Sequence, residues 1–219
     1  PNTYLRPWYR FVNDPDAVEA GLREIIAKPG MTVCYDTETT GLKPLALDAA
    51  IVAMMFRWQD PDTGEPKSLG FPWNFRSKHY DNKVVDHTDR LSSLVLDALC
   101  CSKVVAHNAT FDFLYTLFNV KRPELALFGY QTREELLSAR LNASEFNRLW
   151  DEHVCALANA FQWDTWHMAY TFRQERGTLG LEMLAYLYAP DMAGYEEDMT
   201  LLIKRREWQL FPGARKEVK

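Results

Sequence analysis

Two acidic residues, Asp36 and Glu38, lie one position apart in the segment YDTETTGL, which follows the apolar residues Met31 and Val33. Successive side chains of a β-strand point to opposite faces, so a strand here predicts that both carboxylates lie on the same face. Two like charges this close raise each other's pKa unless a cation lies between them. The pair therefore favours a hard cation with oxygen ligands, such as Mg²⁺. Taken alone, the same spacing is more often found in acids that cap a turn or face solvent.

A third acid, Asp112, belongs to the segment VVAHNATFDFLY, in which a short strand leads into a helix. Asp112 falls in the first turn of that helix, where a carboxylate interacts favourably with the helix dipole. Asn108 or Thr110 is expected to cap the helix. In the alternative interpretation, Asp112 lies across from the Asp36 and Glu38 pair as a third metal ligand.

The rest of the chain predicts the elements that position these acids. Periodicity and turn residues predict helices over 14–27, 89–100, 110–120, 155–172, 178–188 and 194–210, and strands over 31–38, 49–58, 68–75 and, with a polar turn, 103–109. We expect an α/β or α+β domain with a mixed sheet and helices on its faces. In such sheets function lies at the carboxyl ends of strands, where Asp36, Glu38 and His107-Asn108 fall.

Composition narrows the class of protein. The 219 residues fit one domain, with a lead-in over 1–30 and a charged insertion at about 121–152. The net charge of −5 argues against an extended basic surface that binds duplex DNA non-specifically, although metal ions could supply positive charge locally. The four cysteines form no C-x-x-C pair, which favours reduced thiols and a cytoplasmic setting. No stretch has the length of a membrane span, so we expect no membrane partner.

Together, YDTETTGL and AHNATFDFLY resemble the first two motifs of the DEDD 3′–5′ exonucleases. The strongest similarity is to the proofreading exonuclease domain of family A DNA polymerases, the DNA polymerase I type. WDTWHMAY and RGTLGLEMLAYLY are similar, more weakly, to later segments of that family, so the resemblance runs from about residue 31 to 188. It implies an α/β fold of the ribonuclease H-like kind, a mixed β-sheet flanked by helices on both faces.

The resemblance also implies a two-metal mechanism with two Mg²⁺ ions, for which Mn²⁺ can substitute. In such sites one ion activates a water for attack on the terminal phosphodiester and the other stabilises the leaving 3′ oxygen. Asp36 would bridge both ions, Glu38 would hold the ion on the nucleophile side, and Asp112 would hold the second ion.

The same resemblance assigns contacts to the substrate, a DNA 3′ end that is preferably single-stranded. A polymerase domain or subunit is the implied partner, in a bacterial or phage-infected cell. The implied contacts are Thr39 and Leu42 to the terminal nucleotide, His107, Asn108 and Phe111 along the path of the strand, and Arg176 to a phosphate. The alternatives are that Leu42 and Phe111 are core residues and that Arg176 is a solvated residue.

The family's fourth carboxylate, in a Y-x-x-x-D or H-x-x-x-x-D pattern, has no clear counterpart in this sequence. Tyr195 and Asp198 come nearest, with a spacing one residue too short. We expect the missing motif beyond Lys219, and both weak metal binding and strongly reduced cleavage by this segment alone. A module that binds a strand end or a polymerase without catalysis, and a ribonuclease D-like RNA exonuclease, therefore stay open as alternatives.

Overall fold

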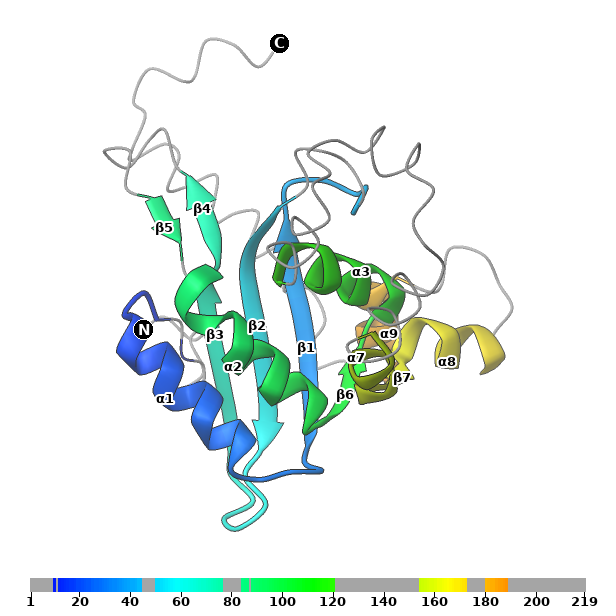
Figure 1. The fold of residues 1–219 in the computed structure, drawn as a ribbon. Helices are drawn as coiled ribbons and strands as arrows, with labels where there is room; N and C mark the ends of the chain where they lie inside the picture. The colour runs from blue at the N-terminus through cyan, green and yellow to red at the C-terminus, as the bar shows by residue number, and fades with distance from the viewer. Residues whose placement is uncertain are drawn as a thin grey trace, which may run out of the picture. The chain divides into compact units, whose positions relative to one another are not determined.

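A computed structural model of the chain describes residues 10, 12–44, 50–76, 84–86, 88–120, 154–172 and 180–188 (Figure 1). Its contacts divide the chain into two compact units, residues 1–165 and residues 166–219. The predicted insertion at 121–152 and the predicted helix at 194–210 lie outside the described residues, as do Arg176, Tyr195 and Asp198. Within the described part, no helix has the length and apolar character needed to cross a membrane.

The first unit is built on a five-stranded mixed sheet in the order β3-β2-β1-β6-β7. The strands β1, β2 and β3 pair antiparallel, whereas β6 pairs parallel with both β1 and β7. A second sheet pairs β4 with β5. The strands are β1 (Thr32–Thr39), β2 (Ile51–Gln59), β3 (Pro66–Pro72), β4 (Asn74–Arg76), β5 (Val84–Asp86), β6 (Lys103–Ala106) and β7 (Phe161–Asp164). This confirms the mixed α/β class expected from the sequence.

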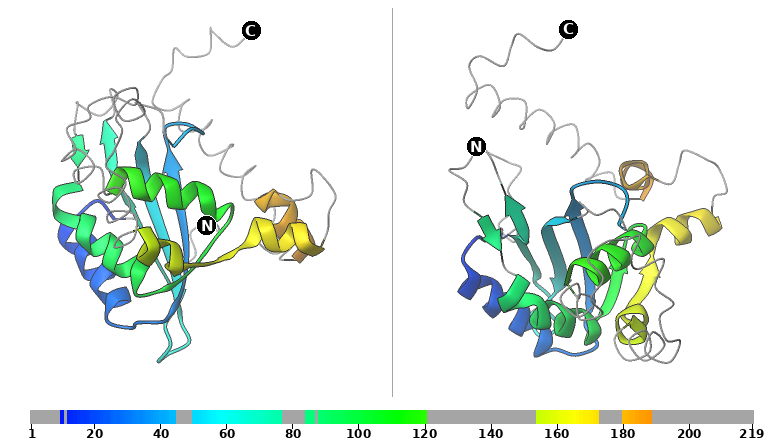
Figure 2. Two further views of the ribbon diagram at one scale, coloured as in Figure 1. Left: turned by 45° about the vertical axis from the view of Figure 1, so that its right-hand side comes forward. Right: turned by 45° about the horizontal axis from the view of Figure 1, so that its top comes forward.

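The helices of this unit form a layer on one face of the sheet, in which α1 packs on α2 and α2 packs on both α3 and α7 (Figures 1 and 2). The expected second helical layer is not among the described residues of the unit, so that part of the prediction stays untested. The helices are α1 (Pro15–Ile26), α2 (Thr88–Cys100), α3 (Ala109–Val120) and α7 (Cys155–Ala160); α8 (Thr165–Phe172) and α9 (Leu181–Tyr188) follow.

One helix prediction is wrong. Residues 155–172 were predicted as a single apolar helix, but β7 interrupts it between α7 and α8. Phe161 and Trp163, two residues apart, pair with Val104 and Val105 of β6. Because pairing with β6 supplies backbone hydrogen bonds and places aromatic residues on a pleated surface, it overrides the helical periodicity of the segment.

The core lies between the sheet and the helical layer. Val18, Leu22 and Ile25 of α1 are fully buried, at the helical spacing predicted from the sequence. The helix begins where Asp14 caps it, with the Asp14 carboxylate accepting a hydrogen bond from the Ala17 amide at 3.2 Å. Burial alternates along β1, so its even-numbered residues face away from this core.

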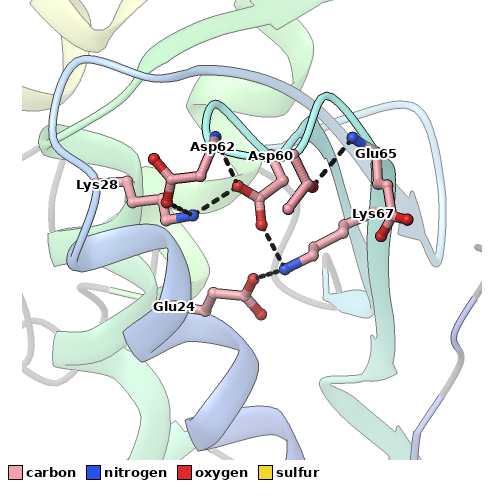
Figure 3. Close-up of polar contacts among 7 residues, drawn as sticks. Glu24, Lys28, Asp60, Asp62, Glu65 and Lys67 are labelled. Carbon is pink, nitrogen blue, oxygen red and sulfur yellow. Dashed lines mark hydrogen bonds and ion pairs between the residues drawn. The ribbon is translucent and has the colours of Figure 1, made fainter.

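An ion-pair cluster ties the end of α1 to the β2–β3 hairpin (Figure 3). The carboxylate of Asp60, which is 4% exposed, contacts the Lys28 ammonium at 2.7 Å and the Lys67 ammonium at 2.7 Å. Lys28 also pairs with Asp62 at 2.9 Å, and Lys67 pairs with Glu24. Hydrogen bonds from Lys28 and Lys67 hold the pKa of Asp60 well below its usual range.

Replacing Asp60 with Asn is expected to lower the melting temperature by about 2–6 °C at pH 7, since two ammonium groups lose their shared counter-charge. Because the folded pKa of Asp60 is depressed, its contribution is present above pH 4 and is lost as the pH falls through the folded pKa. The difference between wild type and Asp60→Asn should therefore narrow below pH 4 in thermal denaturation. If the difference in melting temperature between the two proteins is the same below pH 4 as at pH 7, the ionised Asp60 carboxylate does not stabilise the fold in this way.

Candidate active site

Asp36 and Glu38 share one face of β1, as their spacing predicted. Both residues are exposed. The alternate residues of the strand, Val33, Tyr35 and Thr37, are buried on the helix side. In the antiparallel pairing with β2, Asp36 lies opposite Met55 and Glu38 lies opposite Ala53. The two carboxylates therefore project from the sheet face that is turned away from α3.

The two carboxylates of the pair repel each other. Desolvation raises the pKa of Asp36, and the nearby charge of Glu38 raises it further. Two neighbouring carboxylates are destabilised while both are ionised, and a cation placed between them would relieve the repulsion.

The two motifs meet at one edge of the sheet. Strands β1 and β6 are parallel neighbours, and their last paired residues are Cys34 and Val105. Asp36 and His107 each lie two residues beyond that pair, so both motifs lie at carboxyl ends on the same side. This confirms the expected placement of these motifs at strand ends.

Asp112 approaches β1 from the helix side. It lies in the first turn of α3 and is 2% exposed. Its Oδ1 accepts hydrogen bonds from the Thr37 amide at 3.0 Å and from Thr37 Oγ1 at 2.7 Å. Burial raises the pKa of Asp112 to about 7, and the charge of Asp36 contributes to the rise, while the Thr37 hydrogen bonds oppose it.

The three predicted carboxylates are thus brought to the same stretch of β1, but from its two faces. Within the parts of the chain that the structure describes, no three His, Cys, Asp or Glu residues lie close enough together to hold one metal ion. The exposed pair, Asp36 and Glu38, offers carboxylate oxygens suited to a hard cation, with further coordination left to water or substrate. Asp112 is bound to Thr37 through Oδ1 on the opposite face of the strand.

The turn between β6 and α3 is held by a residue far away in sequence. The Asp164 carboxylate accepts hydrogen bonds from the Asn108 amide at 3.1 Å and the Ala109 amide at 2.9 Å. Asp164 is thus the acid that caps α3, where the sequence predicted Asn108 or Thr110. Asn108 adopts a φ of +59°, a left-handed conformation that asparagine tolerates better than most residues.

The predicted strand-path residues near this turn differ in exposure. Asn108 is exposed, whereas His107 and Phe111 are half-buried. His107 Nδ1 lies 2.9 Å from Thr165 Oγ1, and desolvation lowers the pKa of His107 against the opposing effect of Asp164. His107 is therefore held at this turn by its contact with Thr165.

The predicted contacts to a terminal nucleotide lie in the loop after β1. Leu42 is 87% exposed, so the alternative of a core residue is wrong. Thr39 donates a hydrogen bond from Oγ1 to the Gly41 carbonyl at 2.8 Å. Phe111 is partly buried against the core and packs on Tyr115, with ring centroids 4.8 Å apart. The remaining predicted contact, Arg176, lies outside the described residues.

Sequence reasoning missed Tyr115, whose hydroxyl donates a hydrogen bond to the Gly41 carbonyl at 2.6 Å. Its place in the apolar stripe of the helix gave no local signal of a polar role. It also missed the contact of Thr37 with Asp112, because the two residues are far apart in sequence.

These features define an α/β domain with an exposed carboxylate pair at the carboxyl end of a central strand. No protein-family model matches the chain, and no curated protein matches it either.

Proposed function

We propose that the chain is a metal-dependent 3′–5′ exonuclease that acts on DNA and serves as the proofreading part of a family A DNA polymerase. The observation that carries the proposal is the pair of exposed, mutually repelling carboxylates of Asp36 and Glu38 on β1, the strand that Asp112 of α3 contacts from the other face. The mixed sheet, with its helical layer, supports the ribonuclease H-like class within which such a site is expected.

Asp36 and Glu38 would hold Mg²⁺, or Mn²⁺ in its place, because both present exposed carboxylate oxygens on one face of β1. When bound, the metal supplies an activated water and stabilises negative charge on the phosphate. Asp36 and Glu38 would fix the position of the metal near the carboxyl end of β1. Asp112 accepts two hydrogen bonds from Thr37 and so orders the strand between Asp36 and Glu38.

Leu42 and the exposed Asn108 would receive the strand end, since both lie at the edge that carries the acids. Contact of an apolar side chain with a base and polar contacts with the backbone are sequence-tolerant, as trimming of any 3′ end requires. His107 holds the turn through Thr165 without transferring a proton. The proposed roles of Thr39, Phe111 and Arg176 in substrate binding follow the family resemblance.

A second candidate is a module that binds a strand end or a polymerase without cleaving DNA. It is favoured by one observation: Asp112, the third expected metal ligand, is hydrogen-bonded to Thr37. The two candidates predict the same binding partner but differ in turnover.

The proposal is tested by incubating the protein with single-stranded DNA, duplex DNA or RNA of one sequence, each labelled at its 5′ end. We expect shortening from the 3′ end with Mg²⁺ or Mn²⁺, fastest on single-stranded DNA, and no shortening in EDTA. Faster degradation of RNA would favour the ribonuclease D-like alternative. Binding of single-stranded DNA without shortening, in either metal, would favour the binding module.

A further inference from the structure

The loop after β1 is anchored at one carbonyl by two hydroxyl groups. The Gly41 oxygen accepts hydrogen bonds from Thr39 Oγ1 at 2.8 Å and from Tyr115 Oη at 2.6 Å. The first donor belongs to the loop's own strand, whereas the second belongs to α3, 74 positions along the chain. Leu42 follows Gly41 directly and is 87% exposed, so the backbone is fixed at the residue before an exposed apolar side chain.

Tyr115 is a rigid donor for this contact. The residue is fully buried, and its ring packs against the ring of Phe111 with centroids 4.8 Å apart and planes inclined at 47°. A fully buried ring has little rotamer freedom, so its hydroxyl is directed without further loss of entropy. Tyr115 therefore contacts both the loop that carries Leu42 and the half-buried Phe111.

We propose that Tyr115 is a positioning residue for the DNA 3′ end: through Gly41 it fixes Leu42 relative to Phe111 on α3. The inference rests on the proposed exonuclease function and adds to it the residue that sets the spacing between two substrate contacts. Tyr115 itself is buried and acts through the loop without touching the substrate. Loss of its hydroxyl frees the loop, so that binding of the strand end must order it again.

The test replaces Tyr115 with Phe, which removes only the hydroxyl. We expect the KM for single-stranded DNA to rise by about five- to tenfold, the effect of one neutral hydrogen bond, with kcat changed by less than about twofold. Hydrogen exchange of the amides at residues 40–44 should be faster in this variant than in wild type.

Tyr35→Phe is the matched control. The Tyr35 hydroxyl lies 2.8 Å from Thr116 Oγ1, and this buried contact also joins β1 to α3 but does not involve the loop. We expect Tyr35→Phe to lower the melting temperature as Tyr115→Phe does, while KM and loop exchange stay at wild-type values. The positioning role is overturned if the KM is unchanged in Tyr115→Phe or is raised equally in both variants. Activity of the wild type would in that case still support the exonuclease function. An inactive wild type overturns the proposed function itself.

Discussion

Replacement of Asp36 with Ala is expected to lower the rate of 3′-end hydrolysis by a factor of about 10³ or more. The estimate follows because metal-assisted hydrolysis draws several kcal/mol from charge stabilisation, and each 1.36 kcal/mol corresponds to about a tenfold change in rate. Asp36 interacts electrostatically with both of the other predicted ligands. The charge of Glu38, on the same face of β1, raises the pKa of Asp36, and the charge of Asp36 raises the pKa of Asp112 on the opposite face.

The loss should come from the metal site and not from the fold. Asp36 is exposed and its charge is repelled by Glu38, so Asp36→Ala should keep or raise the melting temperature measured in EDTA. Addition of Mg²⁺ should raise the melting temperature of wild type more than that of the variant, since a ligand stabilises only the state that binds it. Asp97→Ala makes the same chemical change on an exposed helical position and should leave the rate unchanged. Equal activity of Asp36→Ala and Asp97→Ala would rule out Asp36 as a catalytic ligand.

Replacement of Asp112 with Asn is expected to increase the free energy of unfolding by about 2–4 kcal/mol at pH 8 in EDTA. Burial raises the folded pKa of Asp112 to about 7 from its ordinary value of 3.8. The folded protein therefore binds the additional proton between these two values, and wild-type stability falls as the pH rises through this range. Asn carries no charge and keeps an Oδ1 that can accept both hydrogen bonds from Thr37.

Denaturant unfolding of wild type and Asp112→Asn between pH 4 and pH 8 measures this effect. The two proteins should be closest in stability near pH 4, where the Asp112 carboxyl is protonated in the folded state and only begins to lose its proton in the unfolded state, and should diverge as the pH rises. Asp97→Asn, at an exposed position, should follow wild type at every pH. Destabilisation by Asp112→Asn at pH 8 would show that the ionised carboxylate supports the fold, contrary to the raised pKa.

The placement of the two motifs could be predicted from the sequence because it depends on local pattern and a general rule of sheet topology. The apolar run before Asp36 predicts a strand, the turn before Asp112 predicts a strand followed by a helix, and neighbouring parallel strands bring their carboxyl ends to one edge. The shared face of Asp36 and Glu38 follows from the two-residue period of a strand.

The details of the site could not be predicted, because they depend on contacts between distant residues. Thr37 and Asp112 are 75 positions apart, and Asp164 reaches the start of α3 from 56 positions away. The strand β7 was missed for a similar reason: four residues with helical periodicity become a strand only when β6 offers an open edge. Propensity is a weak predictor where tertiary pairing decides.

The central claim is tested most directly by the products formed from 5′-labelled single-stranded DNA in Mg²⁺. We predict a ladder of fragments shortened one nucleotide at a time from the 3′ end by wild type, release of nucleoside monophosphates, and persistence of the full-length strand with Asp36→Ala. Where the chain is part of a longer protein, the same comparison applies to that protein. Persistence of the full-length strand with wild type in both Mg²⁺ and Mn²⁺, or an identical ladder with Asp36→Ala, would contradict the account.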